Sequence, residues 1–271
     1  MRNGLLAALV LVPVACGGGN AAVGTTLAPS TARVATTTTS PPAGCPADTV
    51  PPERLVPQVV SRIPHDPQAF TEGLVLHDGV LYESTGLEGR STVREVDPAT
   101  GRVRAERRLD DRLFGEGLAV GADDRLVQLT WKDRIALVWD RSDLRRTGEL
   151  RYRGEGWGLT TLDDGTLVMS DGSDRLTERD PSDFHVVGTW RVARADGPVD
   201  QLNELEWDGS RLWANRWQTD EIMRIDTRCH RVDAVVDASS LTDEARNEAR
   251  GARFDVLNGI AHVPGTDRFL V

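Results

Sequence analysis

The sequence predicts an all-β protein, a five-bladed β-propeller whose last blade is incomplete at the C-terminus. The main observation is a repeat made of a short apolar strand, a turn rich in Asp and Gly, and a second apolar strand. Successive copies start 41 to 55 residues apart, the extremes being 116 to 157 and 203 to 258. A unit of this length can hold four strands, which is the size of a propeller blade. The five copies begin at Glu72, Glu116, Trp157, Asn203 and Asn258.

Two sets of turn residues fix the register of the repeat. The first set consists of Asp-Gly pairs between the two strands of a copy, which is a strong hairpin signal, at Asp78-Gly79, Asp164-Gly165 and Asp208-Gly209. The second set consists of aspartates that follow the copies, each in a turn between two further predicted strands. These are Asp97, Asp140, Asp180 and Asp226.

Three segments lie outside the regular repeat. Residues 56–64, "VPQVVSRIP", predict a strand that closes the ring as the outer strand of the last blade. The segment "SSLTDEARNEAR" predicts a short peripheral helix that Ser239 or Ser240 can cap. The chain ends at Val271, inside the second strand of its fifth hairpin. We therefore expect that the sequence is truncated, that the third strand of this blade is missing, and that residues 56–64 have no neighbour there.

The first 16 residues have the character of an export signal. Arg2 is followed by an apolar run from Leu5 to Val14 and by small residues up to Cys16. The run is too short for a membrane-spanning helix. The ending Val-Ala-Cys resembles a bacterial lipoprotein signal, which would make Cys16 the lipidated N-terminus. A cleaved secretory signal and a chance apolar start are the alternatives. We expect an exported protein, either a lipoprotein of the bacterial cell envelope or a secreted one.

Residues 17–52 are rich in Thr, Ala, Pro, Ser and Gly and predict a disordered tether, so the propeller would comprise residues 53–271. In an oxidising compartment Cys45 and Cys229 can form a disulfide, and two free thiols are the alternative. The chain of 271 residues has a formal net charge of -10, which argues against nucleic acid or anionic lipid as a partner. We expect a monomer that meets a membrane only through its lipid anchor.

The repeat also predicts a site. The innermost strands of a propeller start at the same end of the central channel, so the first residues of the five copies should converge there. Two carboxylates, an indole and two amides are an unusual choice for packing. Aromatic residues cluster at the same predicted end, although packing between blades is the alternative for any single one of them. They are Phe70, Phe114, Trp131, Trp213 and Trp217. Apolar walls with a few fixed polar groups are typical of a site for a small molecule or a peptide end.

Eight motifs in order resemble the plant and bacterial type of glutaminyl-peptide cyclotransferase, the glutamine cyclotransferase family. They are "IPHDPQAFTEGL", "LYESTGLEGRSTVREVD", "LFGEGLAV", "LTW", "GEGWGLT", "LNELEW", "LWANRWQTDEI" and "DVLNGIAH". The resemblance covers residues 56–271. The resemblance implies a five-bladed propeller without cofactor or metal. It also implies an acyltransferase that cyclises the N-terminal glutaminyl residue of a peptide or protein to 5-oxoproline and releases ammonia.

The resemblance also implies roles for individual residues. Glu116, in its FGEGL context, matches the catalytic glutamate, and a carboxylate there can shuttle the proton that the attacking amine loses and the leaving amine gains. Asn203 matches an active-site asparagine that can hydrogen-bond the substrate amide. Glu72 stands where the family often has Gln, and we expect it to orient the substrate ammonium. Asn258 belongs to the site by position only. The aromatic walls match Phe70, Phe114, Trp131, Trp157 and Trp217.

The sequence departs from the family in one respect. The family has a lysine shortly after the last hairpin, and this chain ends just before that position, with Lys132 as its only lysine. Either the natural protein continues past Val271 or this copy is inactive. Two rival functions also stay open. A metal-dependent propeller hydrolase of the lactonase type could bind a cation through Glu72, Glu116 and the two asparagines. A surface-anchored propeller without enzymatic activity is the other, because this fold serves many functions.

Overall fold

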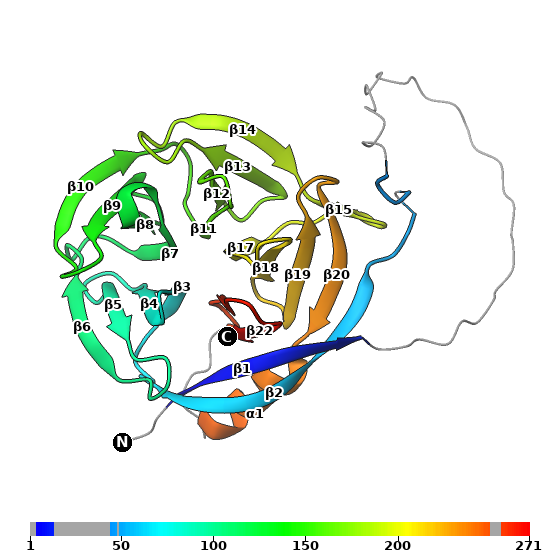
Figure 1. Ribbon diagram of the computed structural model, residues 1–271, viewed down its shortest axis with the longest axis horizontal. Coiled ribbons are helices and arrows are strands. Elements are labelled where there is room, and N and C mark those ends of the chain that lie inside the picture. The colour runs from blue at the N-terminus through cyan, green and yellow to red at the C-terminus, as the bar shows by residue number, and fades with distance from the viewer. Residues whose placement is uncertain (1–3, 14–43, 48, 250–255) are drawn as a thin grey trace, which may run out of the picture.

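The computed structural model describes residues 4–13, 44–47, 49–249 and 256–271. Its strands form four sheets, which make up five blades arranged radially around a central axis (Figure 1). Blade 1 consists of β3 (Thr71–His77), β4 (Val80–Thr85), β5 (Thr92–Val96) and β6 (Val103–Arg108). Blade 2 consists of β7 (Gly115–Val120), β8 (Arg125–Thr130), β9 (Ile135–Asp140) and β10 (Arg146–Arg151). Blade 3 consists of β11 (Leu159–Thr161), β12 (Leu167–Ser170), β13 (Arg175–Arg179) and β14 (Val186–Arg191).

Blades 4 and 5 belong to one continuous sheet. Blade 4 consists of β17 (Leu202–Trp207), β18 (Leu212–Arg216), β19 (Glu221–Asp226) and β20 (Arg231–Asp237). Blade 5 consists, from the axis outward, of β21 (Ala261–Val263), β22 (Arg268–Leu270), β1 (Gly4–Pro13) and β2 (Glu53–His65). The outer strands β20 and β2 join in parallel over three residue pairs. A small hairpin of β15 (Ala193–Arg194) and β16 (Gly197–Pro198) is attached to β20. The sequence prediction of a five-bladed all-β propeller is confirmed.

The turns form as the two sets of turn residues predict. Asp78 and Gly79 have φ angles of 50° and 75°, the left-handed region that Asp-Gly turns require. Asp226 holds the turn after β19, because its Oδ1 accepts the backbone N–H groups of Arg228 at 2.9 Å and Cys229 at 3.0 Å. The other aspartates of this set bind backbone N–H groups in the same way in their own turns, at Asp97, Asp140 and Asp180. Local turn chemistry therefore fixes where each blade folds back.

The hydrophobic core lies between neighbouring blades. Leucines of blade 2 pack against an aromatic and a β-branched side chain of blade 1, and all of them are buried. This cluster includes Tyr82, Val93, Leu118, Leu126 and Leu137. Each strand therefore buries side chains on both of its faces, except at the outer edge of the disc.

Blade 5 differs from the sequence-based expectation. Residues 56–64 form the outer strand β2 as predicted, but β2 has a neighbour, because β1 lies antiparallel between β22 and β2. A two-stranded inner sheet would leave a row of unpaired backbone groups, and an apolar segment can pair with such an edge. Hydropathy along residues 5–14 could not reveal this pairing. Removal of this segment as a signal peptide stays a prediction.

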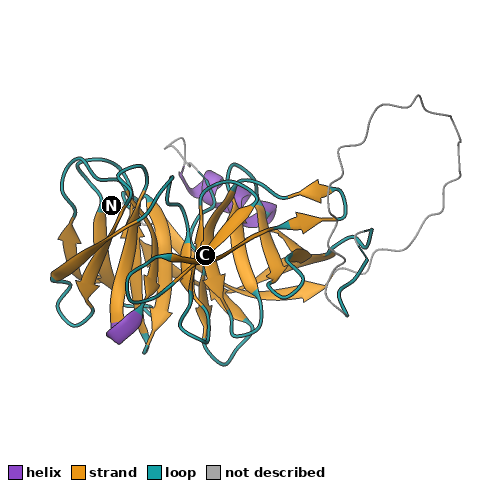
Figure 2. Ribbon diagram, turned by 90° about the horizontal axis from the view of Figure 1, so that it is seen from above, coloured by secondary structure: helices purple, strands orange, loops and turns teal. Residues whose placement is uncertain are grey.

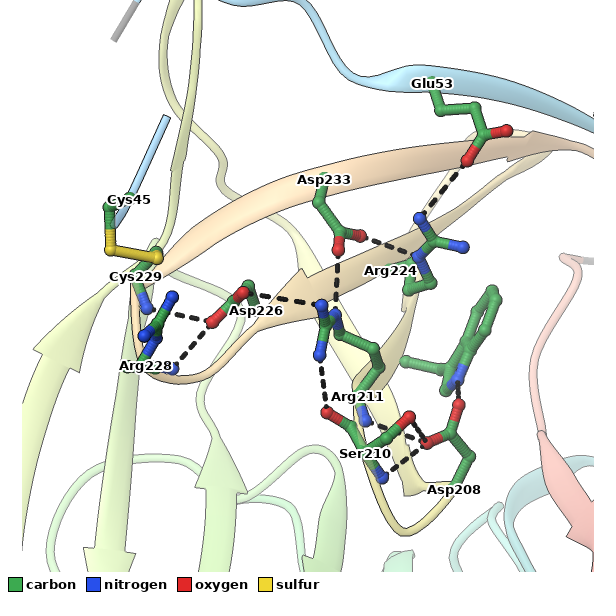
Figure 3. A network of polar contacts seen from close by, with 11 residues as sticks. Cys45, Glu53, Asp208, Ser210, Arg211, Arg224, Asp226, Arg228, Cys229 and Asp233 are labelled. Atoms are coloured by element: carbon green, nitrogen blue, oxygen red, sulfur yellow. Dashed lines mark hydrogen bonds and ion pairs between the residues drawn. A yellow bond between two sulfur atoms is a disulfide. The ribbon is translucent and has the colours of Figure 1, made fainter. Parts of the chain in front are cut away.

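The start of β2 and the segment before it are attached to blade 4 by polar and covalent links (Figure 3). Cys45 forms a disulfide with Cys229 in the turn between β19 and β20, so the first of the two alternatives for these cysteines holds. Arg224 on β19 donates to Asp233 at 2.7 Å and to Glu53 at 3.3 Å. These contacts support the parallel junction of β20 and β2, which is only three residue pairs long.

Helical structure is sparse and peripheral. The helix α1 (Ser239–Ala249) forms where the sequence predicts it, and Arg62 of β2 donates to Glu244 of α1 at 2.7 Å. A short 3₁₀ turn, η1 (Ala122–Asp124), joins β7 to β8. Figure 2 shows the disc edge-on, with the strands running between its two faces. Among the described residues, no helix has the length and apolar character needed to cross a membrane. Cys16 and most of the predicted tether lie outside the described residues.

Candidate active site

The polar residues of the predicted column lie where the innermost strands begin. Glu72, Glu116 and Asn203 each lie at an interruption of the strand ladder, between Thr71 and Gly73 in β3, Gly115 and Leu118 in β7, and Leu202 and Leu205 in β17. Such bulges redirect side chains that a regular strand would place in the packed faces. Trp157 and Asn258 precede β11 and β21. Three of the five blades therefore use the same local distortion.

Contacts between neighbouring inner strands bring the column together around the axis. Gly117, next to Glu116, donates its backbone N–H to the carbonyl of Trp157 at 2.7 Å. A Cβ atom on Gly158, next to Trp157, would lie 2.1 Å from the carbonyl oxygen of Asn203, so the two backbones touch. The side chain of Asn258 meets that of Glu72 across the closure of the ring. The convergence predicted from the repeat is what the structure shows.

Glu116, like Glu72, is a buried acid of this group. It is 6% exposed, and among the described residues no hydrogen bond or ion pair to its side chain is present. Burial raises the pKa of Glu116 well above the usual carboxyl range, and the charges of Glu72 and Glu155 raise it further. A carboxyl group with a raised pKa is a stronger base once it ionises, so it suits proton transfer near neutral pH.

Two side-chain amides have oxygen atoms available for a ligand. Asn203 is 4% exposed, and its Oδ1 is buried with no hydrogen-bond partner among the described residues. Asn258 donates from Nδ2 to Oε2 of Glu72 at 2.6 Å, while its own Oδ1 is likewise buried and without such a partner. Buried polar atoms without partners are costly and are typical of binding sites. Asn258, predicted only by position, therefore also holds Glu72.

Five half-buried aromatic side chains lie at the strand ends where these polar groups are found. The rings of Phe70 and Phe114 lie 6.0 Å apart, and those of Phe114 and Trp131 lie 5.7 Å apart. The rings of Trp157 and Trp217 form a separate T-shaped pair at 5.4 Å. Edge-to-face contacts of this kind favour one relative orientation of the rings. All five aromatic residues predicted for the walls are in these two groups.

Two glycines allow these rings to lie directly on the backbone. A Cβ atom on Gly86 would lie 2.4 Å from the ring of Phe114, and one on Gly172 would lie 2.7 Å from the indole of Trp157. Gly172 also has a φ of 79°, which other residues rarely adopt. The absence of a side chain at both positions therefore sets where the walls stand.

Trp213 does not belong to the site. Its indole N–H donates to Asp208 Oδ2 at 2.7 Å, and its ring packs on Phe269 at 4.8 Å. Because β18 runs antiparallel to β17, Trp213 pairs with Glu206 near the end of β17, far along the strand from Asn203. The sequence grouped Trp213 with Trp217 by proximity in the chain, but the two lie toward opposite ends of the strand.

Glu155, which was not among the predicted site residues, lies in the loop between β10 and β11. Its Oε2 accepts the indole N–H of Trp131 at 2.8 Å and that of Trp157 at 3.1 Å. Lys132, the only lysine, lies with its Nζ 3.5 Å from the centre of the Trp131 ring and 3.9 Å from Glu155 Oε1. The sequence signal for Glu155 is the triplet Gly-Glu-Gly, which precedes Trp157 just as it precedes the Leu of the blade 2 copy.

The described residues offer two groups of side chains whose ligand atoms lie close enough for a metal ion, and both are outside this site. One is His77, Asp78 and Asp124, and the other is Asp180, Asp183 and His185. All of these lie at or next to the ends of strands where the chain turns, rather than in the column. In the column, Asn258 turns its N–H group toward Glu72, which is a hydrogen-bond arrangement rather than a pair of oxygen ligands.

Comparison with known proteins agrees with the geometry. The family model described as glutamine cyclotransferase matches residues 29–271. A glutaminyl-peptide cyclotransferase from Arabidopsis thaliana is 37% identical over 217 residues, which cover 79% of this chain and 67% of the relative. The crystal structure of the glutaminyl cyclase of Myxococcus xanthus superposes with a TM-score of 0.72 at 37% identity, covering 80% of this chain and 91% of that one. The chain therefore belongs to the glutamine cyclotransferase family.

Proposed function

We propose that this chain cyclises N-terminal glutaminyl residues of peptides or proteins to 5-oxoproline and releases ammonia. The observation that carries the proposal is Glu116, a buried carboxyl group with a raised pKa that faces a site walled by half-buried aromatic rings. The similarity to a glutaminyl-peptide cyclotransferase and to a glutaminyl cyclase supports it. The substrate carries both reacting groups, so the site needs only to orient them and move one proton.

The reaction is an acyl transfer within the substrate. The α-amino group reacts as the neutral amine, after its ammonium form has released one proton to solvent. The amine nitrogen attacks the carbon of the side-chain carboxamide, a C–N bond forms, and the carbonyl electron pair moves to oxygen. When the carbonyl re-forms, the original C–N bond breaks and ammonia leaves. Glu116 accepts the proton that the attacking amine loses and gives it to the leaving nitrogen, so it ends in its starting ionised state. General acid–base catalysis of this kind contributes roughly 10²–10⁴-fold.

The other residues of the site bind and orient the substrate in this proposal. The carboxylate of Glu72 attracts the α-ammonium group, and Asn258 holds that carboxylate. The unpartnered Oδ1 of Asn203 accepts an N–H of the substrate carboxamide. The aromatic walls hold the apolar part of the glutaminyl side chain and exclude water, which would otherwise compete with the amine and yield a glutamyl product.

The most direct test of the activity uses a glutamine-initiated dipeptide amide and an asparagine-initiated counterpart. Mass spectrometry should show that the glutaminyl peptide loses one ammonia and that the asparaginyl peptide is unchanged, because only the longer side chain closes a five-membered ring. A glutamyl product would instead indicate a hydrolase. Because the proposed mechanism moves a proton and needs no metal, a chelator should leave the rate unchanged, whereas it would abolish the activity of a lactonase-type enzyme.

We also propose that the protein is an exported monomer that a lipid on Cys16 anchors to the bacterial cell envelope. The Cys45–Cys229 disulfide supports export, because such bonds persist mainly in oxidising compartments. Incorporation of a labelled fatty acid into the native protein, and its loss in Cys16→Ser, tests the anchor. Sedimentation gives the mass of the protein in solution and so tests whether it is a monomer. Equal labelling of the native protein and of Cys16→Ser would contradict the assignment of the lipid to Cys16.

A further inference from the structure

Glu155 connects the two aromatic groups of the site. Phe70, Phe114 and Trp131 come from blades 1 and 2, and their rings contact in sequence. Trp157 and Trp217 come from blades 3 and 4 and form their own pair. No ring contact between the two groups is present among the described residues. The link between them is Oε2 of Glu155, which accepts one indole N–H from each group.

The hydrogen bonds of this link are strong because their acceptor is a carboxylate. A carboxylate acceptor gives a shorter and stronger hydrogen bond than a neutral one, and here one oxygen serves two donors at 2.8 and 3.1 Å. The indole N–H groups of Trp131 and Trp157 are single donors, so each is fully used by this contact. Two hydrogen bonds to one atom fix the rotation of both rings relative to each other, which ring packing alone does not do.

The position of Glu155 favours a role in the site rather than in the core. Its side chain is 41% exposed, and it lies in a loop rather than in a strand. A carboxylate in such a place has no need of an indole partner, because water can hydrate it. The rings gain more from the contact than Glu155 does, since it adds to their packing a hydrogen-bonded link between the two groups.

We propose that Glu155 is a positioning residue for the cyclisation, which locks Trp131 and Trp157 as the walls that hold the glutaminyl side chain. The inference rests on the proposed function. Walls that turn would leave the substrate in several orientations, and a displacement of about 1 Å at a reacting group can cost roughly 100-fold in rate. Glu155 itself need not touch the substrate.

The negative charge of Glu155 has a second effect. Three titratable groups act on Glu116 or are acted on by it: Glu72 from β3, Glu155 from the loop before β11, and Tyr152 from the segment after β10. The charges of Glu72 and Glu155 both favour the protonated form of Glu116. Removal of the Glu155 charge therefore lowers the pKa of Glu116 and moves the acidic limb of the pH–rate profile to lower pH.

The test compares Glu155→Ala and Glu155→Gln with a matched control at the other end of the strands. Asp163, in the turn after β11, accepts the indole N–H of Trp207 at 2.9 Å, so Asp163→Asn disturbs the same kind of contact away from the site. Ammonia release from a glutamine-initiated dipeptide amide gives kcat and KM over a range of pH. Indole N–H resonances, assigned with Trp131→Phe and Trp157→Phe, report the hydrogen bonds without any reference to activity.

Glu155→Ala should shift both the Trp131 and the Trp157 indole resonances and lower kcat/KM by roughly 10- to 100-fold. Glu155→Gln keeps an oxygen acceptor, so it should restore most of kcat/KM while it still moves the acidic limb to lower pH. Asp163→Asn should shift only the Trp207 resonance and leave kcat/KM unchanged.

Two results would overturn the inference: Glu155→Ala within about twofold of the wild-type kcat/KM, or Trp131 and Trp157 resonances that stay in place. The proposed function fails in a different way. In that case the wild-type chain releases no ammonia, while the indole resonances still show whether Glu155 holds the two rings.

Discussion

Asn258 donates a hydrogen bond from its side-chain amide to Oε2 of Glu72 at 2.6 Å. The two residues are 186 positions apart in the sequence and lie at the start of the first and last inner strands. Closure of the ring therefore places a carboxylate of blade 1 with a donor from blade 5. The pairing gives Asn258, which belonged to the predicted site by position alone, a definite task.

Replacement of Asn258 tests this task. Asn258→Ala removes the donor, so Glu72 should become less well oriented toward the substrate ammonium. Hydrogen bonds to charged groups contribute about 1.5–3 kcal/mol, and we expect a rise in KM of about tenfold with a smaller change in kcat. Steady-state ammonia release measures both. A change in kcat alone would contradict the role, because Glu72 is not part of the proton transfer.

The charge of Glu72 should set the pH at which the enzyme becomes active. The negative charge of Glu72 raises the pKa of Glu116, and the base must be ionised to accept the proton of the amine. In Glu72→Gln the pKa of Glu116 falls, so the acidic limb of the kcat/KM profile should move to lower pH. Glu72→Asp keeps the charge and serves as the control. An acidic limb that stays in place in Glu72→Gln would show that Glu116 is not the titrating base.

The free energy of unfolding should fall as pH rises, because Glu206 is protonated in the folded state. Its carboxyl group accepts the backbone N–H of His262 at 2.7 Å, and burial raises its pKa from 4.5 to about 8. Between these values the folded state holds a proton that the unfolded state has lost. The stabilisation is therefore fully present below about pH 4.5 and is lost as pH rises toward 8.

Glu206→Gln should reduce the slope of the free energy of unfolding against pH by up to about 1.4 kcal/mol per pH unit, because the amide mimics the protonated acid. Denaturant unfolding at several pH values measures it, with the exposed Glu88→Gln as the control. Burial also raises the pKa of Glu204, so the free energy of unfolding of Glu206→Gln should still fall somewhat as pH rises. Equal slopes in Glu206→Gln and the wild type would contradict the assignment.

The disulfide should contribute to global stability. Cys45 and Cys229 are separated by 184 positions, so the bond removes much conformational freedom from the unfolded chain. Loss of a native disulfide typically costs about 2–5 kcal/mol. We expect a lower free energy of unfolding in the double variant Cys45→Ser/Cys229→Ser, and the same value for reduced wild-type protein. Denaturant unfolding compares the oxidised wild type, the reduced wild type and the double variant. Equal unfolding midpoints of these three samples would refute the expectation.

Much of this fold was predictable because local chemistry repeats. The Asp-Gly turn at Asp78-Gly79 and the turn aspartate Asp226 act within a few residues, so the sequence reveals them directly. The position of Glu116 was predictable for the same reason, since five copies of one motif must start at one end of a ring. Periodicity therefore supplied both the architecture and the centre of the site.

The rest depends on contacts that no local pattern encodes. Glu155 lies in a loop and accepts a hydrogen bond from Trp131, 24 positions away. The sequence around these two residues gives no sign of this contact. The pairing of β1 with β22 arises from an open strand edge, which hydropathy does not report. Trp213 was misplaced because it lies near the start of β18, whereas Trp217 follows the end of that strand, which is the end beside the site.

The central claim is that Glu116 moves the proton of the cyclisation, and Glu116→Gln tests it most directly. Glutamine has nearly the same size and cannot shuttle a proton, so the folded variant should release ammonia from a glutamine-initiated dipeptide amide roughly 10²–10⁴-fold more slowly than the wild type. Circular dichroism of both proteins checks the fold. Equal rates of the two folded proteins, or no ammonia from the folded wild-type chain, would contradict the account.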